Sequence, residues 1–215
     1  MRRWIIATRS HGKLLELMPM LASHGIVGIG LDDAGVPESD DEQLIEVFAT
    51  FEDNAVAKAR YFSVRTGLPC LADDSGLCLD ALDGAPGVRS RRFGADRGLF
   101  ASAARDEDTS NNEAMLDACW NSGQAPPWRA RYACVACYSD ATQTVSARGE
   151  TEGSIHPQRT GTGGFGYDPY FVSADLGVSF ATASRDDKAR VSHRARAVAT
   201  LLAALAHDPS AIADR

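Results

Sequence analysis

The chain has 215 residues, of which 44% are hydrophobic and 24% charged, a composition typical of a globular protein with one large domain or two small lobes. Its formal net charge of -7 argues against a nucleic-acid-binding protein, which would normally carry a basic face. No apolar run approaches the length of a membrane span, and Arg9 interrupts the apolar N-terminus too early for a signal peptide.

The first predicted elements are a buried strand at Trp4-Ile5-Ile6-Ala7 and a helix that opens at Lys13. Pro19 lies inside this helical pattern and is expected to kink the helix or shift its start. A cation in a first helical turn opposes the helix dipole, where acids are preferred. A strand, a polar loop and a helix N-terminus together form an anion site. Lys13 is therefore either a phosphate-binding cation or a solvated surface lysine.

The following segment is strongly acidic, because Asp and Glu accumulate between Leu14 and Ala57 while no Lys or Arg occurs there. Such a run is usually a solvated face or a mobile loop. Alternatively, it supplies a ligand for Mg²⁺, which proteins hold with one or two carboxylates plus substrate phosphates. A helix is predicted next, capped by Asp53 or Asn54 and ending at Gly67. Lys58 and Arg60 on this helix are expected to be solvated.

Two adjacent carboxylates, Asp73 and Asp74, stand between the apolar runs Cys70-Leu71-Ala72 and Leu77-Cys78-Leu79. The sequence Asp-Asp-Ser-Gly is typical of a turn, so a buried segment is predicted to reach a turn here. In an extended segment, neighbouring side chains point to opposite faces. One carboxylate then faces a functional site while the other supports the backbone. The pattern alone leaves the plain turn and the functional pair open.

The middle of the chain predicts a Gly/Pro turn at Asp83–Gly87 and a surface cluster of Arg89, Arg91 and Arg92. Residues 94–112 are expected to form a loop or short helix, followed by a helix over 113–120. Residues 129–138 and 142–149 alternate as a strand hairpin. The odd number of cysteines, in apolar surroundings, indicates reduced core thiols in a cytoplasmic protein. Cys134 and Cys137 have CxxC spacing but lack a second pair for zinc.

The C-terminal part contains a glycine-rich stretch, Thr160–Pro169, which Phe165 and Tyr167 interrupt. Glycine permits close backbone approach, and the aromatic rings suit a planar base, although a plain glycine loop is the default interpretation. Ser184 and Asp187 resemble a capping box at a helix start. An apolar stripe from Val191 to Leu205 predicts a C-terminal helix on the core. His193 and Arg194 are either polar helix residues or fixed donors for carbonyl oxygens.

Six short motifs occur together in one order along the chain. They are Ala7-Thr8…Lys13, Asn54-Ala55…Lys58-Ala59, Ala72-Asp73-Asp74-Ser75-Gly76-Leu77, Gly84-Ala85-Pro86-Gly87-Val88, Gly161-Thr162-Gly163-Gly164-Phe165-Gly166-Tyr167-Asp168-Pro169 and Ser192-His193-Arg194. In combination they resemble the inosine/xanthosine triphosphate pyrophosphatase family, which hydrolyses aberrant purine nucleoside triphosphates. The resemblance is colinear and spans about residues 4–205.

The resemblance implies an α/β fold, with a long mixed twisted sheet flanked by helices and two lobes with a central cleft. The whole chain, residues 1–215, is then a single two-lobed nucleoside triphosphate pyrophosphatase domain. The resemblance also implies a homodimer, a Mg²⁺ requirement and a nucleoside triphosphate substrate, with neither nucleic acid nor membrane as partner. Water would attack the α-phosphorus, giving the monophosphate and pyrophosphate.

Site residues carry over from the resemblance position by position. Asp74 matches the catalytic carboxylate, as water activator and metal ligand, with Asp73 as its assistant and Glu46 as the second metal ligand. The expected substrate-binding residues are Thr8, Ser10 and Lys13 in the phosphate loop, Ser75 as a further contact, Phe165, Gly166, Tyr167 and Asp168 around base and sugar, and Lys188, His193 and Arg194 on the nucleotide. His193 and Arg194 are expected near the purine 6-oxo group.

The sequence departs from the family pattern at three places. Thr8-Arg9-Ser10 replaces Thr-Gly-Asn, Phe48 stands where glycine is expected, and Asp53 replaces glutamate. Two alternatives to an ITP, dITP and XTP pyrophosphatase therefore stay open. One is the same reaction on a different modified nucleotide, with Arg9 reshaping the pocket. The other is a regulatory nucleotide-binding protein without turnover.

Overall fold

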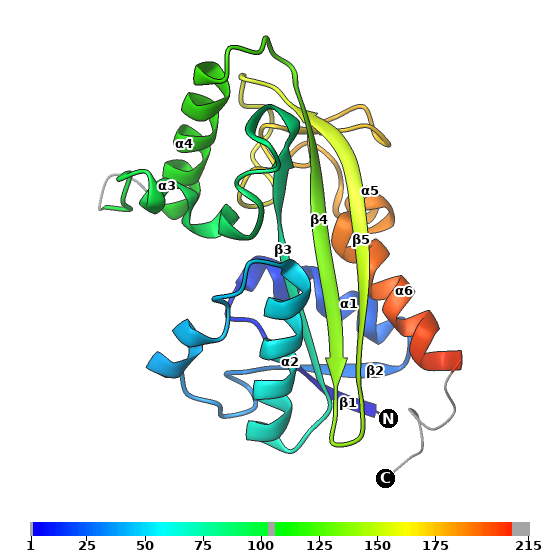
Figure 1. The fold of residues 1–215 in the computed structure, drawn as a ribbon. Coiled ribbons are helices and arrows are strands. Elements are labelled where there is room, and N and C mark those ends of the chain that lie inside the picture. Colours follow the sequence, from blue (N-terminus) through cyan, green and yellow to red (C-terminus); the bar gives the residue numbers. More distant parts are fainter. Residues whose placement is uncertain (1, 103–105, 208–215) are drawn as a thin grey trace. The chain divides into compact units, whose positions relative to one another are not determined.

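The computed structural model describes residues 2–102 and 106–207 and contains both helices and strands (Figure 1). The strands are β1 (Arg2–Ile6), β2 (Ile26–Gly30), β3 (Cys70–Leu79), β4 (Trp128–Ser139), β5 (Thr144–Ile155) and β6 (Phe171–Ser173). The α-helices are α1 (His11–Ala22), α2 (Phe51–Thr66), α3 (Phe93–Asp96), α4 (Glu107–Asn121), α5 (Arg185–Val191) and α6 (His193–His207). Three short 3₁₀ helices are η1 (Asp40–Leu44), η2 (Asp80–Leu82) and η3 (Gly87–Arg92).

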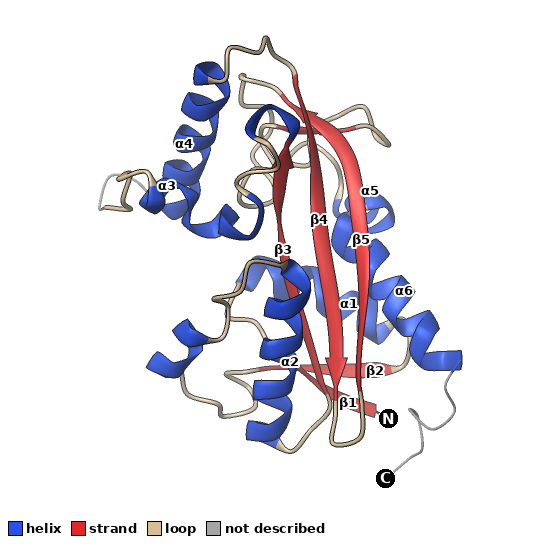
Figure 2. Ribbon diagram, viewed as in Figure 1, coloured by secondary structure: helices blue, strands red, loops and turns tan. Residues whose placement is uncertain are grey.

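The strands form one sheet in the order β2-β1-β3-β4-β5-β6, with β3, β4 and β5 side by side as its long members (Figure 2). β1 pairs in parallel with both β2 and β3, whereas β5 and β6 are antiparallel. The parallel connections are made by α1 and α2, as a crossover between parallel strands requires. The predicted mixed α/β fold is therefore confirmed.

The chain divides into two compact units. The first unit contains the residues up to Asp74, Cys134–Gly149 and the residues from Arg194 onward, and the second contains Ser75–Ala133 and Glu150–His193. Each unit has its own buried apolar cluster. In the first unit, Trp4, Ile6 and Leu71 of the sheet pack with Leu17 and Leu21 of α1 and Leu201 of α6. In the second unit, Leu77 and Tyr132 pack with Met115 of α4 and with Phe171 and Phe180.

The start of the first unit follows the sequence prediction closely. β1 is buried at Trp4, Ile5 and Ile6, and α1 begins directly after the loop that follows it. Ser10 caps α1, because its hydroxyl accepts a hydrogen bond from the backbone N–H of Lys13. Pro19 lies inside α1, and the helix start is not shifted by it.

The predicted cap of α2 was wrong. The helix begins at Phe51, and Thr50 is its N-cap, with its hydroxyl accepting from the backbone N–H of Asp53 at 3.0 Å. The Thr50 hydroxyl also donates to the Asp53 carboxylate at 2.6 Å, so Asp53 completes a capping arrangement one turn inside the helix. The predicted end at Gly67 is confirmed, because Gly67 adopts a left-handed conformation with φ 68°.

The predicted turn at the paired aspartates was also wrong. β3 runs without interruption from Cys70 to Leu79, and nine of its ten residues are buried. Asp73 and Asp74 therefore sit in the middle of a buried strand. The apolar runs on both sides outweigh the turn preference of Asp-Asp-Ser-Gly, because each run pairs and packs as strand.

The predicted hairpin and the predicted helices after residue 112 are confirmed apart from their lengths, whereas β2 and β6 were not predicted and α4 begins earlier, at Glu107. Residues 128–139 and 144–155 form the predicted hairpin as β4 and β5, and Ser184 caps α5 by accepting from the backbone N–H of Asp187. The C-terminal helical region is split, because Ser192 is extended between α5 and α6. All five cysteines are free and buried. No helix within the described residues is long and apolar enough to cross a membrane.

Gly76 shows why glycine follows the aspartates. A Cβ atom built on Gly76 would overlap the backbone carbonyl oxygen of Gly87 and the hydroxyl of Ser90. We expect Gly76→Ala to lower the free energy of unfolding by about 3 kcal/mol or more, because backbone atoms must shift. Urea denaturation monitored by circular dichroism measures this. Gly35→Ala, at φ 67° in open space, is the control and should cost only about 1–2 kcal/mol. Equal losses would contradict the steric explanation.

Candidate active site

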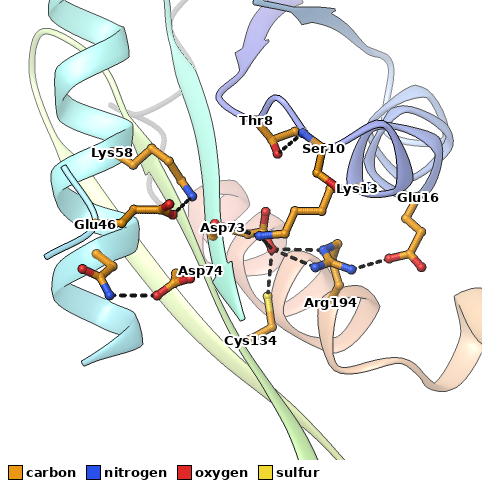
Figure 3. Close-up of polar contacts among 11 residues, drawn as sticks. Thr8, Ser10, Lys13, Glu16, Glu46, Lys58, Asp73, Asp74, Cys134 and Arg194 are labelled. Carbon is orange, nitrogen blue, oxygen red and sulfur yellow. Dashed lines mark hydrogen bonds and ion pairs between the residues drawn. The ribbon is translucent and has the colours of Figure 1, made fainter. Parts of the chain in front are cut away.

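Asp73 is the centre of a charged cluster in the first unit (Figure 3). Its carboxylate oxygen Oδ2 lies 3.1 Å from the Lys13 ammonium on α1 and accepts two hydrogen bonds from the Arg194 guanidinium on α6, at 3.1 and 3.0 Å. Lys13 also reaches the Asp73 backbone carbonyl, at 3.4 Å. The acidic residues of β3 and the cation that follows the β1–α1 loop therefore meet in the structure.

The cations decide the protonation state of Asp73. Burial alone would raise the pKa of this carboxyl group, but Lys13, Arg194 and Lys58 outweigh burial and hold the pKa well below its usual range. Burial likewise opposes the charged form of Arg194, yet Asp73 and Glu16 raise its pKa. Glu16, which lies on α1, forms an ion pair with Arg194. Asp73 is therefore ionised near neutral pH and is a weak proton acceptor there.

The loop between β1 and α1 contains Thr8 and Ser10, which are expected to contact phosphate. The Thr8 hydroxyl accepts from the backbone N–H of Ser10 at 3.1 Å, and Ser10 caps the helix. Both residues are half-buried, and the Lys13 side chain is 17% exposed. Lys13 lies in the first turn of α1, and the positive end of a helix favours an anion.

Asp74 has the opposite environment from its neighbour. Its oxygen Oδ2 accepts a hydrogen bond from the side-chain amide of Asn54 on α2, at 3.0 Å. Burial raises the pKa of Asp74, and Glu46 raises it further, while Lys58 and Lys13 oppose them; the net pKa lies above the ordinary value. A carboxylate with a raised pKa is better matched to proton abstraction near neutral pH. The two aspartates are therefore suited to different tasks.

Glu46 and Lys58 form an ion pair beside Asp74. Lys58 is buried, and although burial opposes its charge, Glu46, Asp73 and Asp74 raise its pKa. Burial also opposes the charge on Glu46, but Lys58 and Lys13 lower its pKa. Lys58 thus carries a buried positive charge that three carboxylates, Glu46, Asp73 and Asp74, stabilise.

Glu46 and Asp74 are the carboxylates of this cluster that could hold a metal ion. Among residues 2–102 and 106–207, no group of three or more His, Cys, Asp or Glu side chains is arranged to hold a metal by itself. Mg²⁺ needs only one or two carboxylates when substrate phosphates complete its shell. Glu46 and Asp74 are close enough for the charge of one to raise the pKa of the other. A divalent cation would relieve that repulsion.

In the second unit, Asp168 organises the predicted base and sugar residues. Its oxygen Oδ2 accepts from the Lys188 ammonium at 2.6 Å and from the backbone N–H of Phe165 at 3.0 Å. The Tyr132 hydroxyl donates to the other oxygen at 3.3 Å. The Lys188 ammonium lies 4.9 Å from the centre of the Phe165 ring. These contacts hold the glycine-rich stretch in one conformation.

Two further contacts fix this stretch. The Tyr167 hydroxyl donates to the Ser90 backbone carbonyl at 2.7 Å, and the Asn112 amide donates to the Gly166 carbonyl at 2.9 Å. His193 stacks on Tyr132 with ring centroids 4.6 Å apart and an interplanar angle of 11°. The second unit therefore gathers Phe165 to Asp168, Lys188 and His193. Ser75 is half-buried and follows Asp74 in β3.

Arg194, which is expected to read the purine base, contacts two carboxylates in this structure. Its side chain is 1% exposed and its guanidinium binds the carboxylates of Asp73 and Glu16. In this structure it neutralises and holds Asp73. Its expected contact with the 6-oxo group stays a prediction.

Asn54 and Lys58 are the important residues that sequence reasoning missed. Asn54 was expected as a helix cap and Lys58 as a solvated cation; both expectations were wrong, since both side chains are buried. A signal was present, because residues four apart share one helix face. Asn54 and Lys58 share that face with the buried Ala55, Ala59 and Phe62.

Comparison with known proteins supports the resemblance. The profile of the Ham1 family matches residues 4–204. A dITP/XTP pyrophosphatase of Nocardia farcinica is 43% identical over 100% of this chain and 98% of its own, and one of Ralstonia nicotianae is 40% identical over 94% and 96%. The structure of a HAM1 protein from Coxiella burnetii matches with a TM-score of 0.78 at 30% identity, covering 97% of this chain and 100% of the other. On its sequence and its fold, this chain belongs to the Ham1 family.

Proposed function

We propose that this protein hydrolyses aberrant purine nucleoside triphosphates, ITP, dITP and XTP, to the monophosphate and pyrophosphate. The observation that carries the proposal is the 3.1 Å contact between the Lys13 ammonium and the Asp73 carboxylate, with Asp74 next to it on β3. The contact brings the phosphate loop to the acidic pair. Relatives of this chain are named dITP/XTP pyrophosphatases.

The two aspartates have separate roles in the proposed reaction. Asp74, with its raised pKa, accepts a proton from the attacking water as the oxygen bonds to the α-phosphorus. The bond from that phosphorus to the bridging oxygen breaks, and pyrophosphate leaves with the electron pair. Asp73 remains ionised and holds Lys13 and Arg194. Asn54 orients the Asp74 carboxylate through its hydrogen bond.

Charge neutralisation is the main requirement of phosphoryl chemistry. Lys13 and Lys58 supply fixed positive charge, and the α1 N-terminus adds backbone N–H donors. Glu46 and Asp74 would hold Mg²⁺. When bound, Mg²⁺ neutralises phosphate charge and makes water easier to deprotonate. Arg9 gives no support to a shifted substrate, because its guanidinium binds Asp32 and Glu42.

Base recognition is assigned to the second unit. Phe165 offers an aromatic surface, and Asp168 and Lys188 keep its loop in place. His193 is proposed as a donor to the 6-oxo group of the purine. Adenine carries an amino group there, and a buried donor without an acceptor costs about 1–3 kcal/mol. Such a contact disfavours ATP by roughly five- to a hundredfold.

The proposal also includes a homodimer and a cytoplasmic location. The family resemblance implies the dimer. Five free, buried thiols support a reducing compartment. The net charge of -7 supports a small nucleotide rather than a nucleic acid as the partner.

Pyrophosphate release with Mg²⁺ tests the reaction. We expect kcat/KM for ITP, dITP and XTP to exceed that for ATP by roughly five- to a hundredfold, because ATP carries an amino group where these substrates carry the 6-oxo group. Asp74→Asn should reduce kcat at least a hundredfold with an unchanged melting temperature, since it loses the base but keeps the shape. Binding of ITP without any turnover would contradict the enzymatic function and indicate a regulatory nucleotide-binding protein. Preference for another modified nucleotide would overturn the substrate assignment.

Asp73→Asn should lower the free energy of unfolding. Its removal leaves the Arg194 and Lys13 charges without their buried partner, which costs about 3–5 kcal/mol at pH 7. The folded pKa of Asp73 is lowered, so its stabilising contribution is complete above its unfolded pKa of about 3.9 and shrinks as pH falls further. Urea unfolding of wild type and variant from pH 7 to pH 3 measures this difference.

The control for that experiment is Asp96→Asn, which removes the carboxylate of the exposed Arg89–Asp96 pair. An exposed pair contributes about 0–1 kcal/mol. A loss in Asp73→Asn no larger than in this control would show that Asp73 is not the electrostatic anchor of the first unit.

The charges around Asp74 predict opposite shifts of its titration. Glu46 raises the Asp74 pKa and Lys58 lowers it. In metal-free protein, Glu46→Gln should therefore lower this pKa and Lys58→Met should raise it. Carbon-13 NMR of the Asp74 carboxyl group measures both. Shifts of the same sign in the two variants would contradict the arrangement.

A further inference from the structure

Arg9 lies inside the phosphate loop but its side chain points to acidic residues outside it. Its Nε and one terminal nitrogen donate to the two oxygens of Glu42 in η1, at 3.2 and 2.8 Å. The other terminal nitrogen donates to Asp32, in the turn after β2, at 2.6 Å. The paired contact with Glu42 has the geometry in which arginine binds a carboxylate most strongly.

The contact with Glu42 is shielded, whereas that with Asp32 is open to water. The side chains of Arg9 and Glu42 are 21% and 15% exposed, and that of Asp32 is 90% exposed. Exposed pairs contribute little. The hydrogen bonds to Glu42 therefore dominate, and they join the residue before the α1 cap to the acidic segment.

The segment 42–48, which contains Glu46, is held at both ends. Arg9 binds Glu42 at one end. At the other end, the Asn54 side chain accepts from the Phe48 backbone N–H at 2.9 Å and donates to the Phe48 carbonyl at 3.2 Å. Between these points Ile45 is buried. Glu46 follows it and pairs with Lys58.

We propose that Arg9 is a positioning residue that holds the segment 42–48 against the phosphate loop and thereby sets the affinity for the magnesium nucleotide. The proposal rests on the proposed function only through the role of Glu46 at the phosphates. Arg9 acts through Glu42 and Glu46 and does not itself touch the substrate. Loss of the contact between Arg9 and Glu42, called the strut below, would leave the segment held at its other end by Asn54.

The strut gives a reason for the arginine at position 9, where the family pattern has glycine. A glycine at position 9, which the family pattern expects, offers no side chain to join the loop to the segment. An arginine there adds a cation that Glu42 and Asp32 neutralise. The charge is thereby directed away from the triphosphate, so the loop keeps Lys13 as its phosphate-facing cation.

The first arm of the test measures the segment without substrate or metal. We expect amide hydrogen exchange over residues 40–48 to accelerate at least tenfold in Arg9→Ala and in Glu42→Gln. Exchange elsewhere in the described chain should be unchanged. Arg9→Lys keeps the charge but loses the two-point contact, so its protection should lie between those of wild type and Arg9→Ala. The matched control is Arg89→Ala, which breaks a comparable two-point pair with Asp96.

The second arm measures nucleotide binding and turnover. Arg9→Ala and Glu42→Gln should each raise KM for ITP, and the Kd of a non-hydrolysable α,β-methylene ITP in Mg²⁺, about tenfold, with kcat within about twofold. The double variant should be no worse than either single variant, since both remove one interaction. Arg89→Ala should behave as wild type.

Three outcomes would overturn the proposal. Arg9→Ala with unchanged exchange over 40–48 removes the strut. A raised KM in Arg9→Ala but not in Glu42→Gln makes Arg9 a direct substrate contact. Additive losses in the double variant show two independent roles. Failure of the wild-type enzyme to cleave ITP, dITP or XTP would be a failure of the proposed function, and the exchange arm would still decide whether the strut exists.

Discussion

The ionised state of Asp73 is the constraint on which the first unit depends. A carboxylate in the middle of a buried strand is tolerated only when cations and donors surround it. Here the cations come from Lys13, 60 residues before it, and from Arg194, 121 residues after it. One side chain therefore joins the centre of β3 to α1 and α6. The same interaction aims the Lys13 ammonium, so the electrostatics that stabilise the unit also prepare the phosphate loop.

Neighbouring positions on a strand allow two identical side chains to have different chemistry. Asp73 faces Lys13 and Arg194, while Asp74 faces Asn54 on α2. The first environment lowers a pKa and the second raises it. Acid and base roles are commonly separated by environment in this way. In this protein the two environments lie at adjacent positions of one strand, and both are occupied by aspartate.

Much of this arrangement could be predicted from the sequence, and the failures have physical causes. Apolar periodicity located β1, α1 and the β4–β5 hairpin, and the combination of motifs located Lys13 and Asp74. The turn expected at Asp73 failed because local turn preference was weighed without the pairing of the strand. Lys58 was expected in solvent because lysine is rarely buried. Its burial depends on Glu46 and the aspartates, which are distant in sequence.

The role of Arg9 illustrates a different limit. Its charge was visible in the sequence, but its partners lie 23 and 33 residues away in an acidic run with many candidates. Only the folded path of the loop after β2 selects Glu42 and Asp32 from them. Long-range pairing of this kind cannot be recovered from local pattern.

The hydrogen bonds between the Asn54 side chain and the backbone of Phe48 bear on which residues position 48 can accept. Both hydrogen bonds go to main-chain atoms of residue 48, and the phenylalanine side chain is 47% exposed. Among the described residues only Asp83 combines a side chain with positive φ, so position 48 makes no demand for glycine. The amide recognises a peptide group that every amino acid except proline can present. Substitutions at position 48 other than proline therefore leave both hydrogen bonds to Asn54 intact. The exposed side chain at this position is free to vary.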